Sequence, residues 1–410
     1  MVEFHKFQLQ NGIRLIVQPN KDTAIASLNV LYDVGSKDEQ PDKTGLAHLM
    51  EHLMFEGSVN IPNYDAVLQN AGGENNAFTN NDVTNYYLYL PAQNLELGFW
   101  LESDRLYQLA LTEKKFLNQQ KVVLEEFEET TLDIPYGDAW HHLRNLTYKK
   151  HPYRWPVIGL TREHVANFTY NDVINFYEKH YQPQHSIWVV AGPVNVDEVK
   201  AMAEKWLANL PNNTTYKRSL FNEPEQHEFR QKTIEGNLPS DALYMAFKMP
   251  GRNNKNYHAC EILSDVLATG RSSRFEQNLV KKQRLFSSIN AFVTSDLEQG
   301  MFVVEGMVNS GVSLSNAEAS VWNELELLKT ELVGEKELER IKNKIETTIA
   351  FSENNPLNTA INIAFYELMG NANEINEEIG KFRSLTSPQI KATANKLFQK
   401  NKCSTVRYKH

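Results

Sequence analysis

The chain has 410 residues, of which 41% are hydrophobic and 23% are charged, values typical of a globular protein with two or three domains. Its formal net charge of -9 argues against a nucleic-acid-binding surface. No apolar run approaches the ~18 residues that indicate a membrane-spanning helix, so no membrane span is expected. Two cysteines, Cys260 and Cys403, exclude a disulfide framework and argue against a thiolate metal site.

The first residues, Met1–Phe7, lack the apolar core of a secretory signal peptide. We expect a cytoplasmic protein if the chain is full length, and a periplasmic one is the alternative if a signal peptide was removed. A reducing compartment fits the low cysteine count, but both alternatives stay open.

In chain order, strands and helices alternate through the first half. Residues rich in β-branched side chains predict strands, and apolar residues at helical spacing predict helices. The predicted strands are 15–18, 26–35, a hairpin over 76–90, and 186–191; the predicted helices lie within 45–57 and near 64–71, 94–109, 113–129, 170–180 and 196–207.

A polar break over residues 209–225 precedes a second series of strands and helices. The two halves repeat each other. Leu28–Gly35 corresponds to Tyr244–Gly251 at an offset of 216, and Thr169–Val189 corresponds to Thr386–Val406 at an offset of 217. Two separated matches with nearly the same offset indicate a duplication.

His48, Glu51 and His52 form the pattern His-x-x-Glu-His, the reverse of the commoner His-Glu-x-x-His. In a helix the two histidines lie one turn apart on one face, where both can reach one zinc ion at about 2.0–2.1 Å. Glu51 is placed to take a proton from water. A catalytic zinc site usually has three protein ligands, so a downstream carboxylate is expected, and Val122–Glu126 supplies one. The alternative for that stretch is a solvated acidic helix face.

Other histidines are weaker candidates. His141 and His142 are expected at the surface or near the site without binding metal. His151 begins an aromatic, proline-containing loop, His151–Gly159, which we expect to be a packed structural turn.

The histidine motif, together with Gly35–Glu39, Gly72–Thr79, Val122–Glu126 and His151–Gly159, resembles the pitrilysin/insulinase zinc peptidases, or inverzincins, which include the mitochondrial processing peptidase. The resemblance covers nearly the whole chain, and its length is similar to the short bacterial branch. It implies an α+β fold with two homologous domains, each an antiparallel sheet with helices packed on it. The expected divisions are a zinc-bearing peptidase domain at 1–210, a linker at 211–226, and a C-terminal domain without the metal motif at 227–410.

The resemblance also implies the site. His48, His52 and Glu126 would bind one Zn²⁺ per chain, and Glu51 would be the general base. Asn76, Ala77 and Phe78 resemble the edge strand that pairs with the substrate backbone. The implied activity is that of a zinc metalloendopeptidase acting on extended peptides or unfolded polypeptides.

Two departures from the family pattern have consequences. Gln119 stands where the family often has a glutamate, seven residues before the third ligand, so zinc affinity is expected to depend on this change. Val280 and Ser287 stand where the family has a substrate-holding Arg and Tyr. We therefore expect a heterodimer in which a homologous partner chain, lacking His-x-x-Glu-His, supplies that pair.

Three alternatives stay open. Lys281, Lys282 or Arg284 could compensate locally for the missing pair. The chain could be an inactive, chamber-forming subunit of a larger complex, although the intact set of metal-binding residues argues against this. It could also be a zinc hydrolase of another substrate class.

Overall fold

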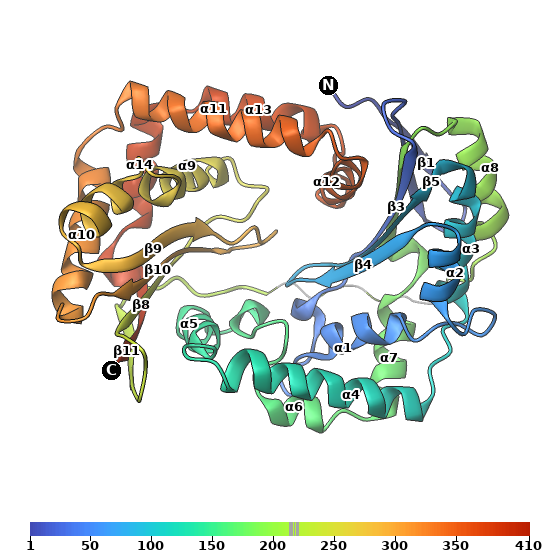
Figure 1. Ribbon diagram of the computed structural model, residues 1–410, viewed down its shortest axis with the longest axis horizontal. Helices are drawn as coiled ribbons and strands as arrows, with labels where there is room; N and C mark the ends of the chain where they lie inside the picture. The colour runs from blue at the N-terminus through green and yellow to red at the C-terminus, as the bar shows by residue number, and fades with distance from the viewer. Residues whose placement is uncertain (213–215, 217, 219–220) are drawn as a thin grey trace. The chain divides into compact units, whose positions relative to one another are not determined.

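The computed structural model describes residues 1–212, 216, 218 and 221–410. It forms two compact units (Figure 1): Met1–Glu128, Pro156–Leu220 and Ala350–Glu377 make the first, and Glu129–Trp155, Phe221–Ile349 and Glu378–His410 make the second. Residues 213–215, 217 and 219–220 of the predicted linker lie outside the described residues. The predicted divisions at 1–210, 211–226 and 227–410 stay a prediction. Among the described residues, no helix combines the length and the hydropathy needed to cross a membrane.

The first unit is built on a six-stranded sheet with the order β1-β2-β6-β3-β5-β4. The strands are β1 (His5–Gln8), β2 (Arg14–Pro19), β3 (Ile25–Tyr32), β4 (Glu74–Thr79), β5 (Thr84–Pro91) and β6 (Ser186–Gly192). The strands and the hairpin predicted from the sequence are confirmed. Strand β3 is buried from Ala26 to Tyr32, because helices cover both faces of the sheet at its centre.

Eight α-helices are described in this unit: α1 (Leu46–Met54), α2 (Tyr64–Asn70), α3 (Leu95–Tyr107), α4 (Glu113–Phe127), α6 (Arg162–Ala166), α7 (Tyr170–His180), α8 (Val196–Leu207) and α12 (Pro356–Leu368). Side chains of α1, α3, α7 and α8 share one hydrophobic core with one face of the sheet. Helix α12 covers the other face, where Ala360, Ile363 and Ala364 pack with residues of β2, β3 and β6 (Figure 1).

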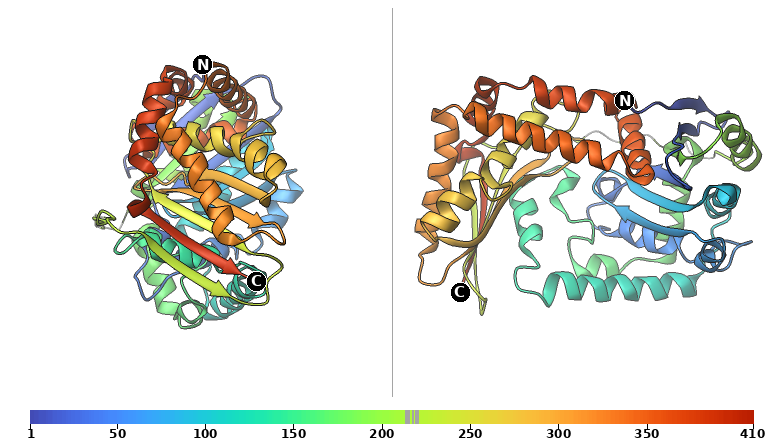
Figure 2. Two further views of the ribbon diagram at one scale, coloured as in Figure 1. Left: turned by 90° about the vertical axis from the view of Figure 1, so that its left-hand side faces the viewer. Right: turned by 45° about the horizontal axis from the view of Figure 1, so that its top comes forward.

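The second unit is built on a five-stranded sheet with the order β7-β11-β8-β10-β9. Its strands are β7 (Arg230–Glu235), β8 (Ala242–Lys248), β9 (Phe286–Val293), β10 (Met301–Val308) and β11 (Cys403–Lys409). The helices are α5 (Ala139–Thr147), α9 (Tyr257–Ala268), α10 (Leu314–Thr330), α11 (Glu335–Ser352), α13 (Glu374–Ser384) and α14 (Ser387–Leu397), with the unit boundaries falling inside α11 and α13. Figure 2 shows β11, in red, between β7 and β8.

The fold is α+β with two sheets and helices packed on them, as predicted. The prediction of antiparallel sheets needs one correction, because each sheet is mixed. β2 pairs with β6 in parallel, and β7 pairs with β11 in parallel, whereas the other pairs are antiparallel. The two strands of each parallel pair are separated in sequence by several helices, and such long crossovers permit parallel pairing.

The two sheets have corresponding strand orders, which supports the duplication. β2-β6-β3-β5-β4 of the first corresponds to β7-β11-β8-β10-β9 of the second. The glycine after the central strand is also equivalent. A Cβ atom on Gly35 would lie 2.6 Å from the carbonyl oxygen of Asn80, and one on Gly251 would lie 2.2 Å from that of Glu298. Both glycines therefore let the chain pass closely over the turn of the neighbouring hairpin.

A buried ion pair in α3 supports the core beneath the motif helix. Nε and Nη2 of Arg105 donate to the Glu102 carboxylate at 2.9 and 2.7 Å. The Tyr64 hydroxyl donates to the same carboxylate at 2.5 Å, and the guanidinium lies 4.4 Å from the centroid of the Tyr86 ring. Arg105 and Glu102 are each 1% exposed, so both charges depend on this pairing.

We expect Glu102→Ala to lower the free energy of unfolding by about 3–5 kcal/mol, because it leaves the Arg105 charge buried without its partner. Urea denaturation monitored by circular dichroism measures this change in the free energy of unfolding. The control is Glu96→Ala, which removes an exposed pair with Lys205 and should cost at most about 1 kcal/mol. Equal effects of the two changes would contradict the importance of the buried pair.

Candidate metal centre and active site

The start of α1 is fixed by backbone constraints. Gly45, the residue before α1, has φ +97°, and a Cβ atom there would lie 2.7 Å from the carbonyl oxygen of Ile158. This position therefore favours glycine. The buried Glu39 carboxylate accepts the Ala47 N–H at 2.8 Å, which satisfies one free donor of the helix N-terminus. These contacts set where the helix begins and hence which residues face the core.

Helix α1 has a buried apolar face and a partly exposed face that carries the motif residues. The apolar face consists of six buried residues: Leu46, Ala47, Leu49, Met50, Leu53 and Met54. His48, Glu51 and His52 are the partly exposed residues of the helix and lie on its other side. Burial of the apolar face thus holds all three side chains of the predicted motif in one place.

Three ligand atoms converge at this face. The Nε2 atoms of His48 and His52 lie 3.8 and 3.6 Å from Oε2 of Glu126, which α4 carries. The two imidazole rings are 4.8 Å apart between centroids and nearly perpendicular. The structure therefore brings together the three residues predicted as a zinc site, and it separates Glu126 from its neighbours, since Glu125 and Glu129 are exposed.

This set fits a zinc ion. Ligand atoms at the usual zinc distances in a tetrahedral arrangement lie about 3.3 Å apart, close to the separations seen here. Two imidazole nitrogens and one carboxylate oxygen are typical donors of a catalytic zinc site. Burial, assisted by the nearby His52, lowers the pKa of His48 to about 4, so its imidazole is neutral near pH 7 and has a free lone pair.

Gln119 orients one of the histidines. Its Oε1 lies 3.3 Å from Nδ1 of His52, and its Nε2 donates to Oε1 of Glu56 at 2.5 Å. An ionised carboxylate accepts hydrogen bonds and donates none, so Glu56 must face the NH₂ group of Gln119. The amide oxygen of Gln119 is thereby directed toward His52. His52 then carries its proton on Nδ1 and keeps Nε2 free for a metal. The sequence reasoning missed Glu56; its position at the end of the motif helix was the only available signal.

Glu51 is held by the neighbouring strand. The Thr79 hydroxyl donates to Oε2 of Glu51, so the last residue of β4 contacts the predicted base. Burial raises the pKa of Glu51, and the hydrogen bond from Thr79 opposes this rise. A carboxylate in this setting can accept a proton and then release it.

The predicted substrate strand is an edge strand. Among the described strands, β4 pairs with β5 alone and stands at the end of the sheet order. Asn76 is exposed, and its side-chain oxygen accepts the N–H of Ala77 at 2.8 Å. Phe78 stacks on Phe365 of α12 with 6.5 Å between ring centroids. The three predicted residues therefore lie on an edge that can pair with an extended chain.

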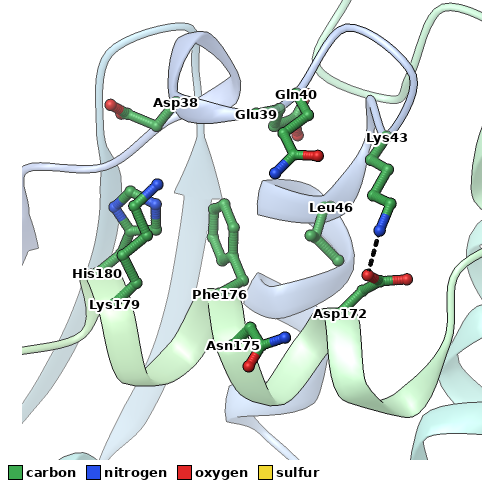
Figure 3. A pocket seen from close by; sticks show the side chains of 10 residues that line it. All are labelled: Asp38, Glu39, Gln40, Lys43, Leu46, Asp172, Asn175, Phe176, Lys179 and His180. Carbon is green, nitrogen blue, oxygen red and sulfur yellow. Dashed lines mark hydrogen bonds and ion pairs between the residues drawn. The ribbon is translucent and has the colours of Figure 1, made fainter. Parts of the chain in front are cut away.

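A separate pocket of about 160 Å³ lies beside the start of α1, between α7 and the segment before α1 (Figure 3). Lys43 forms an ion pair with Asp172 across it, and Leu46 and Phe176 line it. None of the predicted metal-binding residues lines this pocket. The pocket is thus distinct from the candidate metal centre.

The second unit holds the remaining residues singled out in the sequence. His151 is buried, bonds Glu298 at 2.9 Å and accepts the N–H of Tyr153, which confirms a packed turn. His142 bonds Asp138 and Lys232 and lies in no described metal-binding group. Val280 packs against the core, and Ser287, on β9, donates to the carbonyl oxygen of Met307. Val280 has no side-chain donor, and the hydroxyl of Ser287 is too short to reach as far as that of a tyrosine.

Comparisons with known proteins match both halves of the chain to one protein family. Residues 14–159 match the family model described as insulinase (peptidase family M16), and residues 167–345 match the model described as the peptidase M16 inactive domain. The zinc protease PqqE of Helicobacter pylori is 27% identical over 404 residues, covering 97% of this chain and 91% of that protein. A probable mitochondrial-processing peptidase subunit beta of Arabidopsis thaliana is 24% identical and covers 72% of this chain and 58% of its own length.

Solved structures show the same fold. A protease from Helicobacter pylori superposes with a TM-score of 0.96 at 27% identity over the whole of both chains. A peptidase M16 inactive domain from Pseudomonas fluorescens superposes with a TM-score of 0.89 at 17% identity, covering 100% of this chain and 98% of that chain. With matches to both family models and a whole-length relative, the chain belongs to the peptidase M16 (insulinase/pitrilysin) family of zinc proteases, in its short bacterial form.

Proposed function

We propose that this chain is a zinc metalloendopeptidase that hydrolyses extended peptides or unfolded polypeptides, and that it is the zinc-bearing subunit of a heterodimer. The observation that carries the catalytic part is the convergence of His48, His52 and Glu126 beside Glu51. These three residues would hold one zinc ion. The chemistry that zinc supplies at such a site is to acidify water and to polarise a carbonyl group.

Glu51 would move the proton. Thr79 occupies Oε2 of the carboxylate, which leaves Oε1 to accept a proton from the attacking water. The raised pKa of Glu51 helps it to hold that proton and then to pass it to the departing peptide nitrogen. Because Thr79 belongs to β4, the strand that would bind substrate also sets the orientation of the base.

Strand β4 would hold the substrate in an extended form. An edge strand offers main-chain groups to any sequence, which gives affinity without strong side-chain selection. Folded proteins seldom present a free extended segment, so peptides and unfolded chains are the substrates that this edge favours.

The proposal of a heterodimer rests on two residues of the second unit that differ from the family pattern. Val280 and Ser287 cannot replace an Arg and a Tyr as donors to a developing oxyanion. Two relatives are named as beta subunits of a mitochondrial-processing peptidase, which supports the idea of a partner chain. An inactive chamber subunit is less well supported, because such a role would not need an ordered metal-binding set with an oriented histidine.

The ligand assignment predicts the zinc content of variants. His48→Ala, His52→Ala and Glu126→Ala should each lose the zinc of this site, because two ligands rarely retain a catalytic zinc ion. The matched control is Glu125→Ala, which removes an exposed carboxylate one residue away and should bind zinc as wild type does. Competition with a chromogenic chelator measures the affinity. Zinc bound by Glu126→Ala as well as by wild type would refute the assignment and would point to Glu125 or Glu129 instead.

The role of Glu51 predicts a separation of binding from chemistry. Glu51→Gln should keep zinc and the circular dichroism spectrum but lose about 10²–10⁴-fold in kcat, because an amide cannot accept the proton. Turnover of an unstructured fluorogenic peptide by the chain mixed with its partner chain measures the loss. Activity within a few fold of wild type would remove Glu51 from this role.

The heterodimer predicts activity only in a mixture. This chain should be co-expressed with a homologous chain that lacks His-x-x-Glu-His and carries the Arg/Tyr pair. The mixture should cleave the peptide, and replacing the partner's Arg or Tyr should cost about 10²–10³-fold, as for the loss of an oxyanion donor. Full activity of this chain alone would instead favour local compensation by Lys281, Lys282 or Arg284.

A further inference from the structure

The second unit contains another cluster of side chains that could bind a metal ion. Helix α9 follows β8 and Gly251 as α1 follows β3 and Gly35. In α9, His258 and Glu261 lie three residues apart, the same spacing as His48 and Glu51. They are not an aligned copy of the first motif, because the repeat offset of 216 places Ser264 and Leu267 opposite His48 and Glu51.

A third residue joins this pair from α13. Oε2 of Glu378 lies 3.1 Å from Nε2 of His258, and the ligand atoms of His258, Glu261 and Glu378 all lie within 4.8 Å of one another. His258 and Glu378 are each 7% exposed. The His258 ring packs edge-on against Phe382 at 4.8 Å, which fixes its direction.

Two polar atoms of this group are buried without a hydrogen bond among the described residues. They are Nε2 of His258 and Oε2 of Glu261. Oε2 of Glu378 lies close to Nε2 of His258 without forming a hydrogen bond to it. Their separation is similar to the distance of about 3.3 Å between two ligand atoms that bind one ion. A buried polar atom without a hydrogen bond destabilises the fold, and an ion bound between these atoms would remove that penalty.

We propose that His258, Glu261 and Glu378 form a second divalent-cation site, for zinc or manganese, that links α13 to α9. One imidazole and two carboxylates suit these cations better than calcium, which prefers oxygen ligands only. Burial raises the pKa of Glu261 to about 7, so an ion would also hold this carboxylate in its charged form. The site is structural in character, because its ligands are largely buried.

Two cationic side chains modulate the affinity. Nη2 of Arg252 lies 3.5 Å from Oε1 of Glu378, and Nζ of Lys381 lies 3.6 Å from Oε2. They balance the carboxylates without an ion and repel an added cation. The Lys381 side chain is 34% exposed and can turn toward solvent, so it weakens binding without blocking the site.

The test uses the full-length His48→Ala/His52→Ala chain, in which the first site is removed. After chelation and dialysis against zinc or manganese, this chain should retain about one ion, measured by mass spectrometry of the metal. Adding Glu261→Gln should abolish that ion, whereas adding Glu377→Gln, an exposed neighbour on α13, should not. No retained ion, or retention in the Glu261→Gln chain, would overturn the proposal.

A second variant guards against misfolding. Lys381→Gln in the same background should bind the ion about 3–10-fold more tightly, because it removes a positive charge beside the site. Isothermal titration with Zn²⁺ and Mn²⁺ measures this, with Ca²⁺ as the control ion. Unchanged or weaker binding in Lys381→Gln would contradict the site. Because the first site is absent here, failure of this proposal is distinguishable from failure of the proposed peptidase function.

Discussion

The burial of one face of α1 is the constraint on which the candidate active site depends. Because Leu49, Met50 and Leu53 must pack into the core, the opposite face of the helix has no freedom to rotate. His48, Glu51 and His52 then point outward together, and α4 needs to supply only one carboxylate. The glycine at the start of α1 and the Glu39 contact fix the helix along its axis as well. The packing of the helix therefore fixes the positions of the three motif side chains.

The environment around these ligands distinguishes the two histidines. The Nδ1 atom of His48 is buried and has no hydrogen-bond partner among the described residues, and burial lowers the pKa of the imidazole to about 4. His52 is oriented by Gln119, which Glu56 in turn holds. A glutamine at this position lacks the charge of a carboxylate, and Glu56 places a carboxylate behind it. The hydrogen bonds of Gln119 therefore orient His52 despite the departure from the family pattern.

The periodicity of apolar residues and the internal repeat predicted those features of the fold that local sequence patterns determine. The spacing of Leu46, Leu49, Met50 and Leu53 predicted the motif helix, and the repeat offsets predicted two related sheets. The choice of Glu126 over Glu125 needed either the resemblance or the structure, because adjacent residues differ only in which face of α4 they occupy. The parallel strand pairs, the packing of α12 on the first sheet, and the contacts of Glu56 and Glu378 could not be predicted. They join segments far apart in sequence, where no local pattern signals a contact.

Zinc anomalous scattering from crystals of the zinc-loaded chain would show whether His48, His52 and Glu126 bind the ion. We expect a peak at the exposed face of α1, about 2.0–2.2 Å from both Nε2 atoms and from the Glu126 carboxylate. A zinc ion on that face that is bound by Glu125 in place of Glu126, or no zinc there in a chain that cleaves peptides, would contradict this assignment.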